Sequence, residues 1–117
     1  MEAPQTLLIM TSLPDEASAQ ALAESLIAER LAACVSMLAP SRSIYRWQGK
    51  VEVTNEIQLL IKSTPARYPA LESAIRARHP YELPEIVAIP VVAGLPEYLA
   101  WLATESCGPQ TQEPITC

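Results

Sequence analysis

The sequence predicts an α+β domain in which one antiparallel sheet carries two helices on the same face. Three observations lead to this fold class. Strand-like and helix-like segments follow one another in the order β-α-β-β-α-β, a Gln-Gly pair joins the middle two strands as a tight turn, and a short helical segment follows the last strand. A length of 117 residues suits a single domain with its own core.

The first part of the chain predicts a strand, a helix and a second strand. The run from Gln5 to Ser12 is apolar, and the Pro14-Asp15 pair after it provides a turn and a helix start. From Asp15 to about Ala32, apolar residues recur at helical spacing and polar residues line the opposite side. A strand pattern resumes from Cys34 to Leu38.

The middle of the chain, residues 43–62, predicts a β-hairpin with Gln48 and Gly49 as its turn. This turn sets Trp47 opposite Lys50 and separates the side chains into two faces. The polar and aromatic face holds Ser43, Tyr45, Trp47, Lys50, Glu52, Glu56, Gln58 and Lys62. The apolar face, which we expect to meet the helices, holds Ile44, Val51, Val53, Ile57, Leu59 and Ile61.

The last part predicts a helix, a strand and a further helix. The second helix begins at Pro65 or Pro69 and ends at the His79-Pro80 pair. Residues 85–93 form the last strand, and Pro90 within it indicates a sheet edge, because proline has no N–H to donate. Residues 95–104 form the extra C-terminal helix. We predict one domain over residues 1–106 and a disordered tail over residues 107–117, which are polar and contain proline.

The first and last strands predict an oligomer, because both are apolar on each of their faces. A sheet that carries helices on one face only would expose the other face to water. The chain has no further helices to form a third layer. Other copies of the same chain are therefore the expected cover, in a closed cyclic assembly.

Charge and hydropathy exclude two classes of partner. The net charge is −5 and the basic residues are scattered, so we expect no nucleic acid as a partner. No apolar run approaches the roughly 20 residues that a membrane-spanning helix requires, so we expect no membrane partner. The N-terminal residues lack the pattern of a signal peptide, and we expect a cytoplasmic location.

Five motifs in order give the chain a resemblance to a known family. They are LAACVS (31–36), SIYRWQGKVE (43–52), EIQLLIKS (56–63), HPYELPEI (79–86) and YLAWL (98–102). Together they resemble the CutA divalent-cation-tolerance family over roughly residues 6–103. The resemblance implies a ferredoxin-like fold in a homotrimer similar to the PII signal-transduction proteins, together with divalent-metal tolerance and copper binding.

The chain departs from the family pattern at two positions. Arg78 stands where some members carry the first of two histidines, and Ser36 stands where many carry asparagine. Imidazole ligands are therefore few. The expected cofactor is copper or another divalent metal.

The candidate metal ligands are His79, Cys34, Glu82 and Glu85. His79 is the single histidine, and the two glutamates follow it within a proline-bounded loop. Each of the first two has a structural alternative. His79 suits a position at the end of a helix, where it would cap carbonyl groups, and Cys34 suits a small buried apolar site.

The candidate ligand-binding cleft lies between subunits and holds Trp47, Glu56, Lys62, Tyr81 and Trp101. The alternative for Glu56 and Lys62 is an exposed ion pair or a bridge across an interface, and the alternative for the two tryptophans is a packing role at the subunit interface. The expected function is a signalling trimer that binds a metal ion or a small ligand such as an anion. The alternatives are a small enzyme, for which no glycine-rich phosphate loop or nucleophile–base pair is present, and a structural scaffold.

Overall fold

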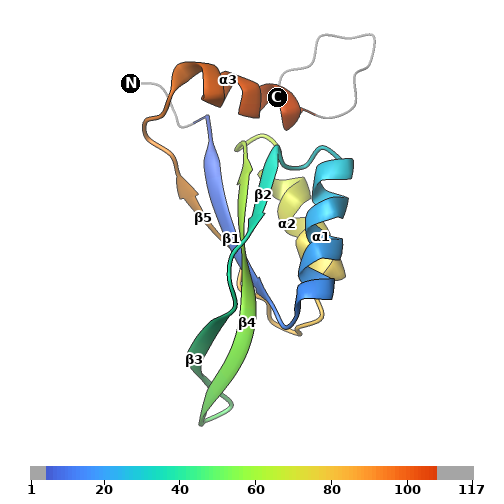
Figure 1. The fold of residues 1–117 in the computed structure, drawn as a ribbon, viewed down its shortest axis with the longest axis vertical. Helices are drawn as coiled ribbons and strands as arrows, with labels where there is room; N and C mark the ends of the chain where they lie inside the picture. The colour runs from blue at the N-terminus through green and yellow to red at the C-terminus, as the bar shows by residue number, and fades with distance from the viewer. Residues whose placement is uncertain (1–4, 108–117) are drawn as a thin grey trace.

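The computed structural model describes residues 5–107 as an antiparallel sheet with two helices on one face and a third helix across one end (Figure 1). This confirms the predicted α+β class and the ferredoxin-like order of elements. In chain order the elements are β1 (Leu7–Leu13), α1 (Glu16–Ala28), β2 (Cys34–Met37), β3 (Ser41–Trp47), β4 (Lys50–Ser63), α2 (Tyr68–Arg78), β5 (Val87–Pro90) and α3 (Pro96–Glu105). Most of the predicted tail, residues 108–117, lies outside the described residues.

The sheet has the strand order β2-β4-β1-β5, and β3 also pairs with β4. The long strand β4 holds this arrangement together, because β2 pairs with its residues 59–62 and β3 with its residues 50–56. The β3–β4 hairpin therefore projects beyond the rest of the sheet (Figure 1). At the other side β5 is an edge strand, which agrees with the position of Pro90 at its end.

The hairpin has the predicted register. Trp47 pairs with Lys50, and Tyr45 pairs with Glu52. The turn residues Gln48 and Gly49 have φ angles of 51° and 81°. Two successive positive φ angles are the requirement of a type I′ turn, whose twist matches that of the strands it joins.

The core lies between the sheet and the helices α1 and α2. Asp15 caps α1, since its side chain accepts a hydrogen bond from the Ser18 N–H at 2.7 Å. The fully or almost fully buried core side chains come from both layers: Ile9, Leu13, Ile57, Leu59 and Ile61 from the sheet, and Ala19, Leu22, Leu26, Leu71 and Ile75 from the helices. One face of the sheet and two helices thus form a single cluster.

Two predicted boundaries were wrong. Helix α1 ends at Ala28 rather than near Ala32, because the chain turns at Arg30, whose φ angle of 57° is left-handed. Strand β5 covers four residues and not the whole stretch 85–93. In both places the apolar pattern continues past the end of the element. A prediction from periodicity alone therefore made both elements too long.

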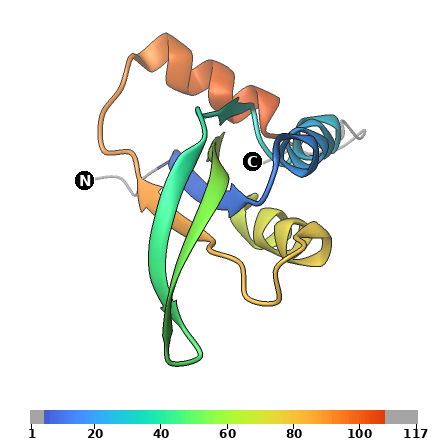
Figure 2. The same ribbon diagram turned by 60° about the horizontal axis from the view of Figure 1, so that its bottom comes forward.

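The apolar face of the hairpin meets the helices only in part. Ile57, Leu59 and Ile61 are buried as predicted, whereas Ile44, Val51 and Val53 are 68%, 62% and 59% exposed. The prediction for these three was wrong because the hairpin extends past the ends of α1 and α2 (Figures 1 and 2). Alternation specifies the face of a residue but not whether a helix reaches it.

The second face of the sheet is partly uncovered in the single chain. Leu8 pairs with Ile89 and Met10 with Val87, so these four side chains point away from the face that carries Ile9. Val87 and Ile89 are 45% and 49% exposed. Helix α3 lies at one end of the sheet and leaves this part of the face open (Figure 1).

Two neighbouring positions on α1 test the packing of the core. Leu26 is fully buried and Ile27 is 41% exposed. We expect Leu26→Ala to lower the free energy of unfolding by about 2–5 kcal/mol, because it opens a cavity that the surroundings fill only in part. Ile27→Ala should cost less than about 1 kcal/mol. Urea denaturation of both variants at one protein concentration makes the comparison, and equal losses would contradict this packing.

Candidate ligand pocket

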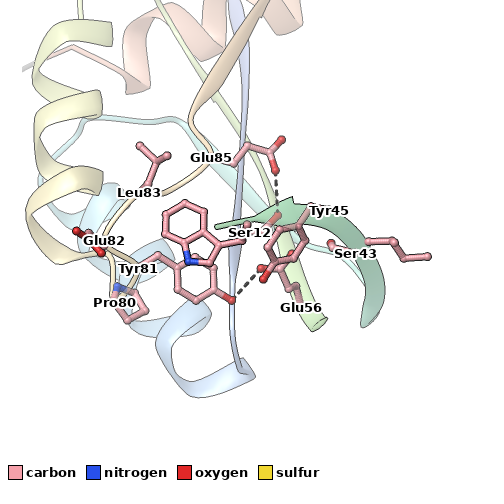
Figure 3. Close-up of a pocket in the computed structure, with 11 residues that line it drawn as sticks. Ser12, Ser43, Tyr45, Glu56, Pro80, Tyr81, Glu82, Leu83 and Glu85 are labelled. Atoms are coloured by element: carbon pink, nitrogen blue, oxygen red, sulfur yellow. Dashed lines mark hydrogen bonds between the residues drawn. The ribbon is translucent and has the colours of Figure 1, made fainter. Parts of the chain in front are cut away.

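A pocket of 630 Å³ lies between the β3–β4 hairpin, the end of β1 and the loop that follows α2 (Figure 3). Its volume lies within the usual range for sites that take small ligands. The lining side chains come from three regions far apart in sequence: Ser12 of β1, Ser43, Ile44, Tyr45, Trp47 and Glu56 of the hairpin, and Pro80, Tyr81, Glu82, Leu83 and Glu85 of the loop.

A tyrosine–glutamate hydrogen bond connects the loop to the hairpin. The Tyr81 hydroxyl donates to Oε2 of Glu56 at 2.8 Å (Figure 3). Burial, together with the Glu56 carboxylate, raises the pKa of the Tyr81 phenol far above its usual range. The phenol therefore keeps its proton and remains a donor. Glu56 itself is only 7% exposed.

His79 fixes the start of the same loop against β1. Its ring Nε2 lies 2.7 Å from the backbone oxygen of Ser12, and its Nδ1 accepts from the Tyr81 backbone N–H at 3.1 Å. A carbonyl oxygen can only accept, so Nε2 carries the hydrogen of a neutral imidazole. Burial lowers the pKa of His79, against the opposing effects of the Ser12 hydrogen bond and the Glu56 charge. Both ring nitrogens are thus occupied by backbone groups.

The structure does not bring the four candidate metal ligands together. Glu82 and Glu85 line the pocket, and Glu85 accepts a hydrogen bond from the Ser12 hydroxyl at 3.4 Å. Cys34 lies on β2 opposite Lys62, at the other end of β4 from the hairpin. Within residues 5–107 no group of three or more His, Cys, Asp or Glu side chains is placed to hold a metal ion. One chain therefore does not fit a copper site.

The alternative role for His79, a residue at a helix end that caps carbonyl groups, is close to what the structure shows. His79 is the C-cap residue of α2, and its backbone N–H donates to the Ile75 carbonyl. Its ring, however, binds the carbonyl of Ser12 on β1 rather than a carbonyl of the helix. The side chain connects two elements and does not only end one. A metal ion at either ring nitrogen would replace one of these hydrogen bonds.

Three of the five candidate cleft residues meet in the pocket, and two do not. Trp47, Glu56 and Tyr81 line it. The Lys62 amine instead donates to the Tyr98 hydroxyl at 3.2 Å, and Trp101 stacks beside Tyr98 with ring centroids 5.6 Å apart. Within residues 5–107 Glu56 and Lys62 do not form the exposed ion pair, since each of these side chains bonds to a different tyrosine, and a bridge across a subunit interface stays a prediction.

Several residues of the pocket were not predicted from the sequence. Tyr45 shares a strand face with Trp47, so the period of two that placed Trp47 also contained the signal for Tyr45. Ser12 carried no such signal. Its place in the pocket depends on how β1 and the loop after α2 meet in space, which is set by the helix packing.

None of the helices within residues 5–107 combines the length and the apolar character needed to cross a bilayer.

Comparison with known proteins identifies the family. The family described as CutA1 divalent ion tolerance protein matches residues 7–105, and the chain belongs to this family. The divalent-cation tolerance protein CutA of Pectobacterium atrosepticum is 46% identical over 96 residues, which cover 82% of this chain and 87% of that protein.

Solved structures give the same result. CutA from Xylella fastidiosa is 50% identical, with a TM-score of 0.84 and coverage of 86% of this chain and 97% of that one. A protein from Archaeoglobus fulgidus described as a periplasmic divalent cation tolerance protein is 31% identical, also with a TM-score of 0.84, over 86% of this chain and 98% of that one.

Removal of one hydroxyl tests the bond that joins the loop to the hairpin. Tyr81→Phe deprives the buried Glu56 carboxylate of its donor, and we expect a loss of about 1–3 kcal/mol in unfolding free energy. Tyr68→Phe is the matched control, because the Tyr68 hydroxyl donates to Glu72 in an exposed pair. The unfolding free energy of Tyr68→Phe should fall by less than about 0.5 kcal/mol. Similar values for both variants in urea denaturation would argue against a structural role for the Tyr81 bond.

The lowered pKa of His79 predicts a pH dependence of stability. Because the folded protein holds the neutral imidazole, the unfolded chain binds more protons as the pH falls below about 6.5. The contribution of His79 is therefore complete above about pH 6.5 and declines from there toward its folded-state pKa. We expect the urea midpoint to fall between pH 7.5 and 5.8, and to fall less in His79→Gln. An equal fall of the urea midpoint in the wild type and in His79→Gln would show that His79 does not cause the pH dependence.

Proposed function

We propose that this member of the divalent-cation tolerance family works as a homotrimer that binds a small ligand or metal ion between its subunits, as a PII-like signalling protein. One observation carries the proposal. The single chain exposes apolar side chains on both faces of its sheet, Val87 and Ile89 on one and Ile44, Val51 and Val53 on the other.

These exposed residues favour an assembly with copies of the same chain. They lie on two regular surfaces, the open sheet face and the projecting hairpin, and not at scattered positions. A hairpin that projects from one subunit can cover the open face of a neighbour, while its own subunit is covered by the next. Such a head-to-tail contact closes as a ring when the rotation between neighbouring subunits is a whole fraction of a turn. The number three comes from the resemblance to the family.

The pocket supports a role in binding rather than turnover. It is bordered by the hairpin, so a neighbour that packs on the hairpin also affects the pocket. The imidazole next to it uses both ring nitrogens to hold backbone groups, which removes it as a general base. The hydrogen bond between Tyr81 of the loop and Glu56 of the hairpin holds these two side chains in place, as in a preformed binding site.

Copper binding is proposed only with donors from more than one copy, since the ligands of one chain do not fit a metal site. A symmetric assembly brings equivalent carboxylate, imidazole or thiol groups together around its axis. The cytoplasmic location stays a prediction.

Native mass spectrometry tests the assembly and the metal together. We expect the mass of three chains for the wild type, and a shift toward one chain for Ile89→Glu, which places a charge on the open sheet face. Ile27→Glu is the control, because Ile27 has a similar exposure on the helix layer. It should leave the trimer intact. A wild-type monomer at micromolar concentration would contradict the trimer.

Addition of one equivalent of Cu(II) per chain extends the test. We expect retained copper in the trimer and little in the Ile89→Glu monomer. Equal retention by both would place the metal donors within one chain, contrary to the structure.

A further inference from the structure

We propose that the 630 Å³ pocket binds an organic cation, an alkylated ammonium group held between the Tyr45, Trp47 and Tyr81 rings and the Glu56 carboxylate. This inference names the ligand class for the pocket of the proposed function. It stands on observations within one chain and does not require a particular number of subunits.

The charge of the lining selects a cation. Three carboxylates line the pocket, those of Glu56, Glu82 and Glu85, and no Lys, Arg or His side chain is among the lining residues. A small anion would meet only like charge there. Lys62, the basic residue of the predicted cleft, points to Tyr98 instead.

Glu56 provides the second and independent observation. Its side chain is 7% exposed, and among residues 5–107 it forms no ion pair. The Tyr81 hydroxyl bonds to Oε2, which is a neutral partner for a charged group. A buried carboxylate without a counter-charge is costly, and a cation in the pocket would remove that cost.

The aromatic walls select the kind of cation. Within the described chain, the contact of Tyr81 with His79 is the single contact with another aromatic ring that any of the three rings makes, and Tyr45 and Trp47 are 41% and 38% exposed. The hydroxyl of Tyr45 shares a 2.8 Å hydrogen bond with Thr54, and that of Tyr81 is bound to Glu56. Both rings are therefore held in place before a ligand arrives.

Aromatic rings beside a carboxylate suit an alkylated ammonium better than a divalent metal. An ammonium with methyl groups is weakly hydrated and is attracted to the faces of Trp and Tyr within about 6 Å. A divalent metal ion requires several donor atoms at short distance, and the described residues contain no such group. The carboxylate supplies the charge and the rings supply the contact area.

Calorimetric titration with choline chloride tests the proposal, at constant ionic strength and neutral pH. The neutral analogue 3,3-dimethylbutan-1-ol has the same shape as choline but lacks the charge. We expect choline to bind and the analogue to bind at least about tenfold more weakly, because both the carboxylate and the ring faces act on the charge.

Two pairs of variants locate the site. Glu56→Gln and Trp47→Leu should each weaken choline binding by about tenfold or more. Glu72→Gln removes an exposed carboxylate on α2, and Tyr68→Leu removes an aromatic ring on the same helix, outside the pocket. These two controls should leave the choline affinity unchanged. Trp47→Leu keeps the test valid should Glu56→Gln fail to fold.

Two results would overturn the proposal. Equal affinity for choline and its analogue, or no binding of either, would exclude recognition of the charge. A Glu56→Gln variant that alters the assembly mass but not the choline affinity would show that the counter-charge is a basic side chain of a second copy. The wild-type mass separates the two hypotheses: a trimer that ignores choline contradicts only the ligand class, and a monomer that binds choline contradicts only the trimer.

Discussion

The candidate pocket depends on one buried imidazole. His79 joins the end of β1 to the loop after α2 through Ser12 and the Tyr81 backbone, and it does so as a neutral ring with both nitrogens occupied. That loop then presents the Tyr81 hydroxyl to Glu56 on the hairpin. A residue that resembled a metal ligand in the sequence is instead the connection through which three distant segments form one cavity. The structural role of His79 and a role as a metal ligand exclude each other, because each hydrogen bond uses a ring nitrogen that a metal ion would need.

The sequence predicted local geometry well and contacts between distant elements poorly. The Gln48-Gly49 turn and the alternation around it determined the register of every pair in the hairpin, since a two-residue turn leaves no other pairing. Pro90 correctly indicated an edge strand. By contrast, the partners of Glu56 and Lys62 could not be derived from the strand they share. Tyr81 reaches Glu56 from a loop, and Tyr98 reaches Lys62 from the last helix. These contacts are set by how the layers pack, which periodicity does not encode.

The same limit explains the apolar side chains of the hairpin. Ile44, Val51 and Val53 have the pattern of core residues, and the structure of one chain exposes them. The pattern is not an error of interpretation if the core to which they belong is formed between copies. A sequence records which side chains are to be kept from water, but not whether the cover comes from its own helices or from a neighbour. Exposure in one chain and apolar periodicity in the sequence therefore have to be considered together.

The length of β4 has a consequence for how the chain tolerates insertions and deletions. One continuous strand of 14 residues carries the hairpin arm, Glu56 of the pocket, the core residues Leu59 and Ile61, and Lys62 beneath α3. Loss or gain of a single residue between Glu56 and Lys62 would turn one part of the strand over, placing leucine and isoleucine in water and charge beneath the helices. We therefore expect changes in length to be tolerated at the hairpin tip and in the loops outside the strand. Among related chains, we expect the length of β4 to stay constant, because β1, β2 and β3 all pair with it.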